Sequence, residues 1–237
     1  MRIIEKPLTH FNERKSPIDM LVIHSMAHGV KDGWEALDKY NLSAHYIIGP
    51  TGGIYRCVDE KKRAWHAGVA SWRGIDKDLN SHSIGIEVCH PTLGQHSFHK
   101  GQMHNLITLC QDIITRHNIK PEMIVGHSDI APTRKPDPGK GFPWKFMADN
   151  GIGLWYGKEA LAETNINKLL QTIGYETSTE DHLIASAYAF CRHFMPEKVI
   201  SLPVEEVVET PYPKDNIKLL KDRSFIKRLQ QVAYVYK

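Results

Sequence analysis

The chain has 237 residues, of which 41% are hydrophobic and 24% are charged, and its formal net charge is +3. This composition is ordinary for a globular protein, and the sequence has no run of about 18–20 apolar residues that could span a bilayer. The small net charge does not favour nucleic acid as the main partner. The length predicts one main domain with a smaller addition.

The elements of the first part of the chain are strands and one long helix. Five short apolar runs predict strands at residues 20–24, 44–48, 53–58, 83–89 and 123–127. A hairpin turn is expected at 51–53, and a helix at 102–117, where apolar residues recur every three or four positions. This alternation predicts an α/β domain over residues 1–155, with a mixed central β-sheet flanked by helices.

The rest of the chain predicts helices only. Residues 156–200 form a small helical appendage in this interpretation, with helices at about 158–173 and 181–194. Residues 201–237 are expected to be a linker followed by a basic amphipathic helix from about residue 214. We expect this helix to dock on the protein or on a second copy; contact with a membrane surface or an anionic polymer is the alternative.

Cysteine usage and the first residues bear on the compartment. Cys57, Cys89, Cys110 and Cys191 have neither the spacing of a paired-cysteine zinc site nor the density of a disulfide scaffold, so we expect reduced thiols. The first residues carry charges where a secretory signal needs an uninterrupted apolar core. A cytoplasmic protein is therefore the default expectation, and the periplasm or cell envelope is the alternative.

Two histidines and an aspartate predict a metal site. His24 and His127 end two predicted strands, and Asp137 follows His127 by ten residues. Strand ends can converge, and two histidines with one loop carboxylate would leave an open fourth position, as in catalytic zinc sites. With 14 histidines in the chain, a surface or core role is the alternative for each one singly. The rival pair His96 and His99 has no obvious third ligand.

Lys135 and Glu87 are the candidates for proton and charge chemistry. Lys135 and Asp137 each precede a proline, which favours extended backbone and places residues two apart on the same side. An ammonium near the metal could stabilise a developing oxyanion; a solvated lysine in a rigid proline loop is the alternative. Glu87 lies in an apolar strand, on the face opposite Ile84 and Ile86. It is the natural proton shuttle if that face turns to the metal, and otherwise an exposed carboxylate.

Four segments resemble the zinc-dependent N-acetylmuramoyl-L-alanine amidases of the amidase type 2 family, which includes the peptidoglycan recognition proteins: LVIHS, SAHYIIGPTGGIYRCVDEKKRAWHAGVASWRG, SIGIEV and VGHSDIAPTRKPDPG. The resemblance covers roughly residues 15–145. It implies one Zn²⁺ per chain bound by His24, His127 and Asp137, with Glu87 and Lys135 as the catalytic pair. It also implies hydrolysis of the amide between N-acetylmuramic acid and the L-alanine of peptidoglycan stem peptides.

The same resemblance implies a substrate groove lined by Trp65, His66, Trp72 and Arg73. A sugar ring suits an aromatic wall, and the carboxylates of the stem suit an arginine. Core tryptophans and a solvated arginine are the alternative.

The appendage resembles the helical peptidoglycan-binding module of larger family members, with Cys191 in place of the usual glutamine. Polymer binding and a purely structural cap are both open. Non-catalytic members of the family lack part of the zinc site, whereas all five residues are present here, so an enzyme is favoured. We expect peptidoglycan fragments as partners, with 1,6-anhydro and intact muramyl groups both cleaved in cell-wall turnover and recycling. Another amide is the weaker alternative.

Overall fold

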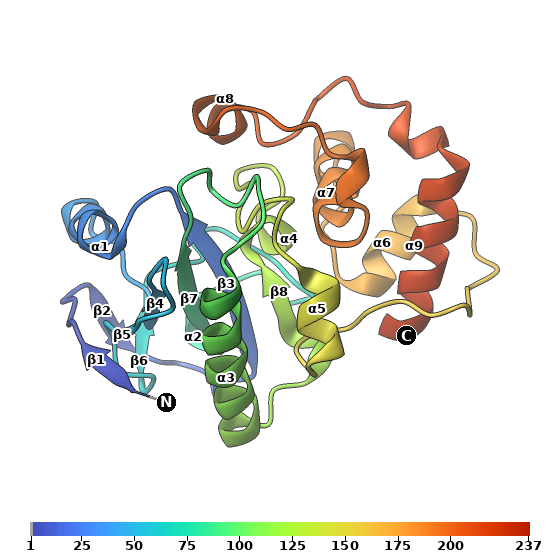
Figure 1. The fold of residues 1–237 in the computed structure, drawn as a ribbon. Coiled ribbons are helices and arrows are strands. Elements are labelled where there is room, and N and C mark those ends of the chain that lie inside the picture. Colours follow the sequence, from blue (N-terminus) through green and yellow to red (C-terminus); the bar gives the residue numbers. More distant parts are fainter. Residues whose placement is uncertain (1) are drawn as a thin grey trace.

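The computed structural model describes residues 2–237. Its main sheet contains β1 (Ile3–Glu5), β3 (Met20–Met26), β4 (Tyr46–Ile48), β5 (Ile54–Arg56), β7 (Ser83–Cys89) and β8 (Ile124–Gly126). The strand order is β1–β5–β4–β7–β3–β8 (Figure 1). Only β4 and β5 pair antiparallel, across the turn at Gly52, whose φ is 97°. The mixed sheet that the sequence predicts is thus confirmed.

Helices and a separate two-stranded sheet complete the sheet domain. Its helices are α1 (Val30–Lys39), α2 (Leu79–His82), α3 (Lys100–His117), α4 (His127–Ile130) and α5 (Trp144–Asp149), with a 3₁₀ turn η1 (Pro121–Met123). A separate antiparallel pair joins β2 (Phe11–Glu13) to β6 (Lys62–Ala64). The elements agree with the predicted strands and with the predicted long helix, which is α3.

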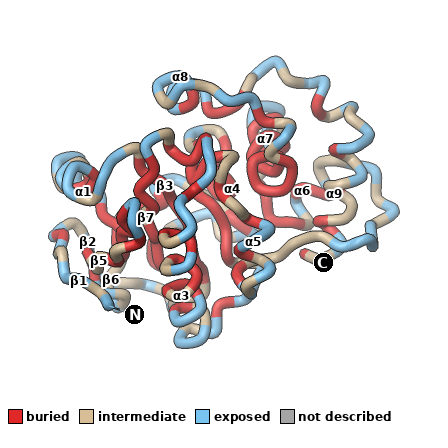
Figure 2. The backbone as a smooth tube through the Cα atoms, in the orientation of Figure 1, coloured by how far each residue is buried: buried red, intermediate tan, exposed pale blue. Residues whose placement is uncertain are grey.

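Side chains alternate along each strand, so the two faces of the sheet carry different residues. On β7, Ile84, Ile86 and Val88 belong to the core that α3 and α5 cover. The intervening Gly85 and Glu87 therefore point to the opposite face. Figure 2 shows β3 and β7 buried except at the half-buried Glu87, as expected for strands in the middle of a covered sheet.

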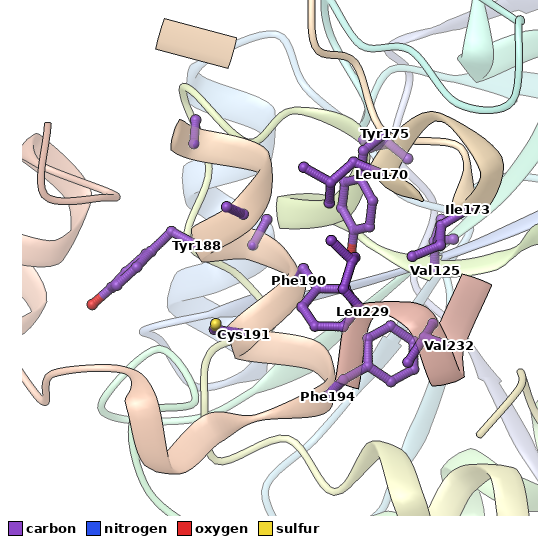
Figure 3. Close-up of a cluster of buried hydrophobic side chains, with 14 of the residues drawn as sticks. Val125, Leu170, Ile173, Tyr175, Tyr188, Phe190, Cys191, Phe194, Leu229 and Val232 are labelled. Carbon is purple, nitrogen blue, oxygen red and sulfur yellow. The ribbon is translucent and has the colours of Figure 1, made fainter. Parts of the chain in front are cut away.

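The C-terminal part consists of α6 (Ile166–Ile173), α7 (Glu180–Phe194), α8 (Val204–Glu209) and α9 (Arg223–Tyr236), with 3₁₀ turns η2 (Pro196–Lys198) and η3 (Leu219–Lys221). Figure 1 shows α6, α7 and α9 grouped beyond β8 and α4. Figure 3 shows their shared core, in which Leu170, Phe190 and Leu229 pack together near Val125 of β8. The last helix is thus docked on the appendage and continues the core of the sheet domain.

The structure differs from the sequence-based expectation at several boundaries, and the segment expected to be a linker contains the helix α8. The helix expected from 158 begins at Ile166, because Glu163 accepts from the N–H groups of Thr164 and Asn165, and the Asn165 side chain caps α6. The helix expected from 214 begins at 223, where Asp222 is the N-cap. The strand expected to end at His127 stops one residue earlier, and His127 opens α4.

Two further observations concern the whole of the described chain. All four cysteines are free and buried, as expected. No helix within residues 2–237 has the length and apolar character needed to cross a membrane.

Candidate metal and catalytic site

Three donor atoms from separate elements meet at the end of the central strands. The Nδ1 atoms of His24 and His127 lie 2.9 Å apart. Asp137 places its Oδ2 atom 3.1 Å from Nδ1 of His127 and 3.4 Å from Nδ1 of His24. All three residues are buried. Among the described residues they form the one group of three such side chains close enough to hold a metal ion.

The protonation states of these residues suit metal binding. Burial and the neighbouring His127 lower the pKa of His24 to about 4, so its imidazole is neutral at neutral pH. Burial raises the pKa of Asp137, but His127 and His24 outweigh that effect and hold it well below its usual range. A neutral imidazole and an ionised carboxylate are the forms that ligate metals.

Asp129 fixes the helix that carries His127. Its carboxylate accepts from the N–H of Gly126 at 2.8 Å, from the Tyr175 hydroxyl at 2.6 Å and from Nδ1 of His193 at 2.9 Å. Tyr175 follows α6 and His193 lies on α7, so the appendage holds α4 in place. Sequence analysis missed these residues. The sequence did contain one signal for them: Asp129 lies in an apolar segment, and a buried carboxylate is tolerated only when hydrogen-bonding or charged partners surround it.

Glu87 lies beside this trio. It pairs in register with His24 across β3 and β7, and its Oε2 atom is shielded from solvent without a hydrogen-bond partner. Burial, together with the Asp137 carboxylate, raises the pKa of Glu87 to about 8, and the Lys135 ammonium opposes this shift. A carboxyl group poised near neutral pH can both accept and donate a proton.

These residues open into a cleft of about 480 Å³, a size typical of ligand pockets. Glu87, Lys135 and Asp137 all line it, and so does Pro136, which lies between the last two. Its lining also includes residues of α1, the segment around Trp65 and His66, and Val204 and Val208 of α8.

The other two expected substrate contacts lie elsewhere. Trp72 is 1% exposed, donates its Nε1–H to the carbonyl of Glu122 and packs edge-on against Tyr175. Arg73 donates to the carbonyls of Thr172 and Ile173. Both residues join the sheet domain to the appendage, so their position corrects the expectation that they line the groove: neither is among the residues lining the cleft.

The rival histidine pair has a local structural role at most. His96 and His99 are exposed, and His99 caps α3 by accepting from the N–H of Gly101 at 3.2 Å. Neither residue belongs to a group of three metal donors within residues 2–237.

Comparison with known protein families shows to which family the chain belongs. The Amidase_2 family, described as N-acetylmuramoyl-L-alanine amidase, matches residues 14–140, which is more than half of the chain. The chain belongs to this family. All five residues of the proposed site lie within the matched span.

Individual relatives agree. The chain is 40% identical over 152 residues to the N-acetylmuramoyl-L-alanine amidase AmiD of Escherichia coli, covering 58% of this chain and 55% of AmiD. It is 40% identical over 103 residues to the 1,6-anhydro-N-acetylmuramyl-L-alanine amidase AmpD of Enterobacter cloacae, covering 44% of this chain and 54% of AmpD. The chain thus spans about half the length of these curated relatives.

The fold agreement is more extensive. A solved complex of E. coli AmiD with anhydro-N-acetylmuramic acid-L-Ala-D-gamma-Glu-L-Lys matches with a TM-score of 0.72 and 28% identity, covering 95% of this chain and 93% of that chain. The likeness in fold therefore extends past residue 140 into the helical appendage.

Proposed function

We propose that the protein is a zinc-dependent amidase that hydrolyses the amide between N-acetylmuramic acid and the L-alanine of peptidoglycan stem peptides. Its substrates are muropeptides with 1,6-anhydro or intact muramyl groups, and its role is in cell-wall turnover and recycling. The observation that carries the proposal is the meeting of His24, His127 and Asp137 beside Glu87, at a cleft lined by all of these residues except His24, within a chain of this family. The anhydro-muramyl peptide bound by the related AmiD supports the substrate class.

The donor set fits one zinc ion per chain. Zinc takes imidazole nitrogen and carboxylate oxygen at about 2.0–2.2 Å in tetrahedral geometry, which separates neighbouring donors by about 3.3 Å. The three separations here, 2.9, 3.1 and 3.4 Å, are close to that value. Three protein ligands would match a catalytic zinc site, in which zinc would keep one position for water or substrate, rather than a structural site with four protein ligands.

Glu87 and Lys135 carry the proton and charge steps. When bound, zinc supplies a Lewis acid that polarises the scissile carbonyl and acidifies water. Glu87 accepts a proton from the attacking water and passes it to the departing nitrogen of L-alanine, so that water and amide become a carboxylic acid and a free amine. The Lys135 ammonium lies in the same cleft and stabilises the negative charge that develops on the carbonyl oxygen.

The rest of the chain shapes the cleft in this proposal. Residues 1–155 form the catalytic domain, 156–200 a module like the peptidoglycan-binding module of larger relatives, and 201–237 a linker and C-terminal helix. Trp65 presents an aromatic side chain to a sugar ring. Val204 and Val208 add apolar surface to the same cleft. The linker segment therefore contributes to the substrate site.

Mass spectrometry of purified muropeptides tests the proposal. Anhydro and intact muramyl tripeptides are each incubated with the protein, and the products are weighed. We expect free stem peptide beginning with L-alanine from both. Cleavage within the stem would indicate a different amide substrate, and no cleavage by zinc-loaded protein would indicate a recognition protein.

A further inference from the structure

His66 contacts a metal ligand as well as the cleft. Its Nδ1 atom lies 2.9 Å from Nε2 of His24, and the two rings meet edge-on with centroids 5.0 Å apart. On its other side, Nε2 of His66 lies 3.2 Å from the hydroxyl of Ser83. That hydroxyl lies 2.6 Å from the carbonyl oxygen of Leu79. These groups form one continuous chain of hydrogen bonds that ends at His24.

The donor and the acceptor of each of these hydrogen bonds can be assigned by starting from the carbonyl of Leu79. A carbonyl oxygen only accepts, so the single Ser83 proton goes to Leu79, and Ser83 must accept from Nε2–H of His66. A neutral imidazole carries one ring proton, so Nδ1 of His66 is an acceptor. It therefore receives the Nε2–H of His24. This leaves Nδ1 of His24 with a free lone pair, and that atom faces His127 and Asp137.

The segment that carries His66 orients the second histidine as well. The carbonyl oxygen of Ala67 lies 3.2 Å from Nε2 of His127, which must donate to it. His127 is thus also held with its Nδ1 lone pair toward the site. The side chain of Asn80 fixes this segment, since its Oδ1 accepts from the N–H groups of His66 and Ala67 at 3.1 and 2.8 Å.

β7 leaves room for the His66 ring at Gly85, which has no side chain. A Cβ atom at Gly85 would lie 2.4 Å from Cγ of His66, which is far inside van der Waals contact. Gly85 belongs to the face of β7 that also carries Glu87. Gly85, Ser83 and Asn80 thus hold the His66 ring against His24.

We propose that His66 is a positioning residue, which with the Ala67 carbonyl holds both histidine ligands in the tautomer that presents Nδ1 to the metal. This inference rests on the metal site of the proposed function. Outer partners that fix the orientation of ligating histidines typically change metal affinity by about 10–100-fold when removed. His66 therefore acts on the metal through His24, in addition to any contact with substrate.

The test measures zinc affinity and tautomer state rather than turnover. Zinc-stripped wild type, His66→Phe and His66→Asn are titrated against a chelating indicator, with His117→Gln as the control for loss of a half-buried histidine, since the His117 ring pairs with Glu60 at the end of α3. Phenylalanine keeps a ring of similar size without an acceptor, whereas the Asn carbonyl can replace Nδ1. We expect His66→Phe to weaken zinc binding about 10–100-fold, and His66→Asn to recover most of the loss.

Long-range ¹H–¹⁵N spectra of the zinc-free proteins give an independent readout. We expect the Nε2–H form of His24 in wild type and a mixture of tautomers in His66→Phe. If His66→Phe does not fold, Ser83→Ala, which removes only the hydroxyl, is expected to shift the tautomers in the same direction. Wild-type zinc affinity in a folded His66→Phe, or equal losses in the Phe and Asn variants, would overturn the inference. Absence of zinc binding by wild type would instead overturn the proposed function.

Discussion

His24 and Glu87 lie directly opposite each other on the adjacent parallel strands β3 and β7. Because side chains alternate along a strand, both leave the face that α3 covers. Glu87 lines the cleft, and His24 contacts His127 and Asp137, which also line it. A slip of one residue between these strands would turn one of the two into the core. The distance between the proposed metal ligand His24 and the proposed proton carrier Glu87 is therefore set by the centre of the sheet rather than by a loop.

Glu87→Gln keeps the shape of the side chain and removes its ability to carry a proton. We expect turnover to fall by about 10²–10⁴-fold, the usual contribution of a general acid–base group. Zinc content should stay at the wild-type level, because Glu87 is not among the three donors. Metal analysis and product release on the same preparation measure both quantities, and near-normal turnover would remove Glu87 from the mechanism.

Val208 of α8 is 52% exposed and lines the cleft. Val208→Asp places a charge on this apolar wall and should raise KM roughly 5-fold with little change in kcat, since about half of a valine's burial energy, about 1 kcal/mol, is lost. Ile200→Asp is the matched control, because Ile200 is similarly exposed, at 60%, but lies outside the cleft. Equal KM values in the two variants would show that α8 does not contact substrate.

Trp72 and Trp65 should respond differently to truncation. Trp72→Ala removes a buried ring and is expected to lower the free energy of unfolding by about 3–5 kcal/mol, with KM unchanged in the folded protein. Trp65→Ala, at a half-buried cleft position, should mainly raise KM. Urea titration and steady-state kinetics distinguish the two. A raised KM with unchanged stability in Trp72→Ala would contradict the buried position.

Glu60 should make stability depend on pH in the acid range. Burial raises its pKa, but hydrogen bonds from Arg116, Tyr46 and His117 outweigh that effect and lower it from 4.5 to about 2. The ionised form is therefore favoured by folding, and its contribution is complete above about pH 4.5 and is lost as the pH falls toward 2.

Unfolding in urea between pH 3 and 6 measures this contribution as the difference between wild type and Glu60→Gln. We expect a gap of about 2–3 kcal/mol at pH 6 that narrows as the pH falls. The same gap at both ends of the range would show that the Glu60 interactions are not linked to its ionisation.

The sequence predicted the sheet because strands have a local pattern of apolar residues. It predicted the three metal donors because two of them lie at the ends of predicted strands and the third lies in the loop that follows. Alternation in residues 83–89 separated Ile84 and Ile86 from Glu87, and the structure keeps that separation. Prolines after Lys135 and Asp137 predicted a shared side, and both line the cleft. These signals lie within a few residues of the groups that they position.

The remaining features depend on contacts between distant segments. Trp72 looks like a groove residue until the appendage, about 100 residues later, covers it at Tyr175. The pairing of Asp129 with His193 and the arrival of α8 at the cleft have no local periodicity that could predict them. The tautomer-setting role of His66 appears only when Ser83 and Gly85 lie beneath it.

In the proposed function, a single zinc ion at His24, His127 and Asp137 makes this protein an amidase. The most direct measurement is release of stem peptide from an anhydro-muramyl tripeptide by zinc-stripped protein, as zinc is added back in fractions of one equivalent. We predict no release without metal and a linear rise that stops at one zinc per chain. Full release by the metal-free protein, or no release at one equivalent, would contradict the claim.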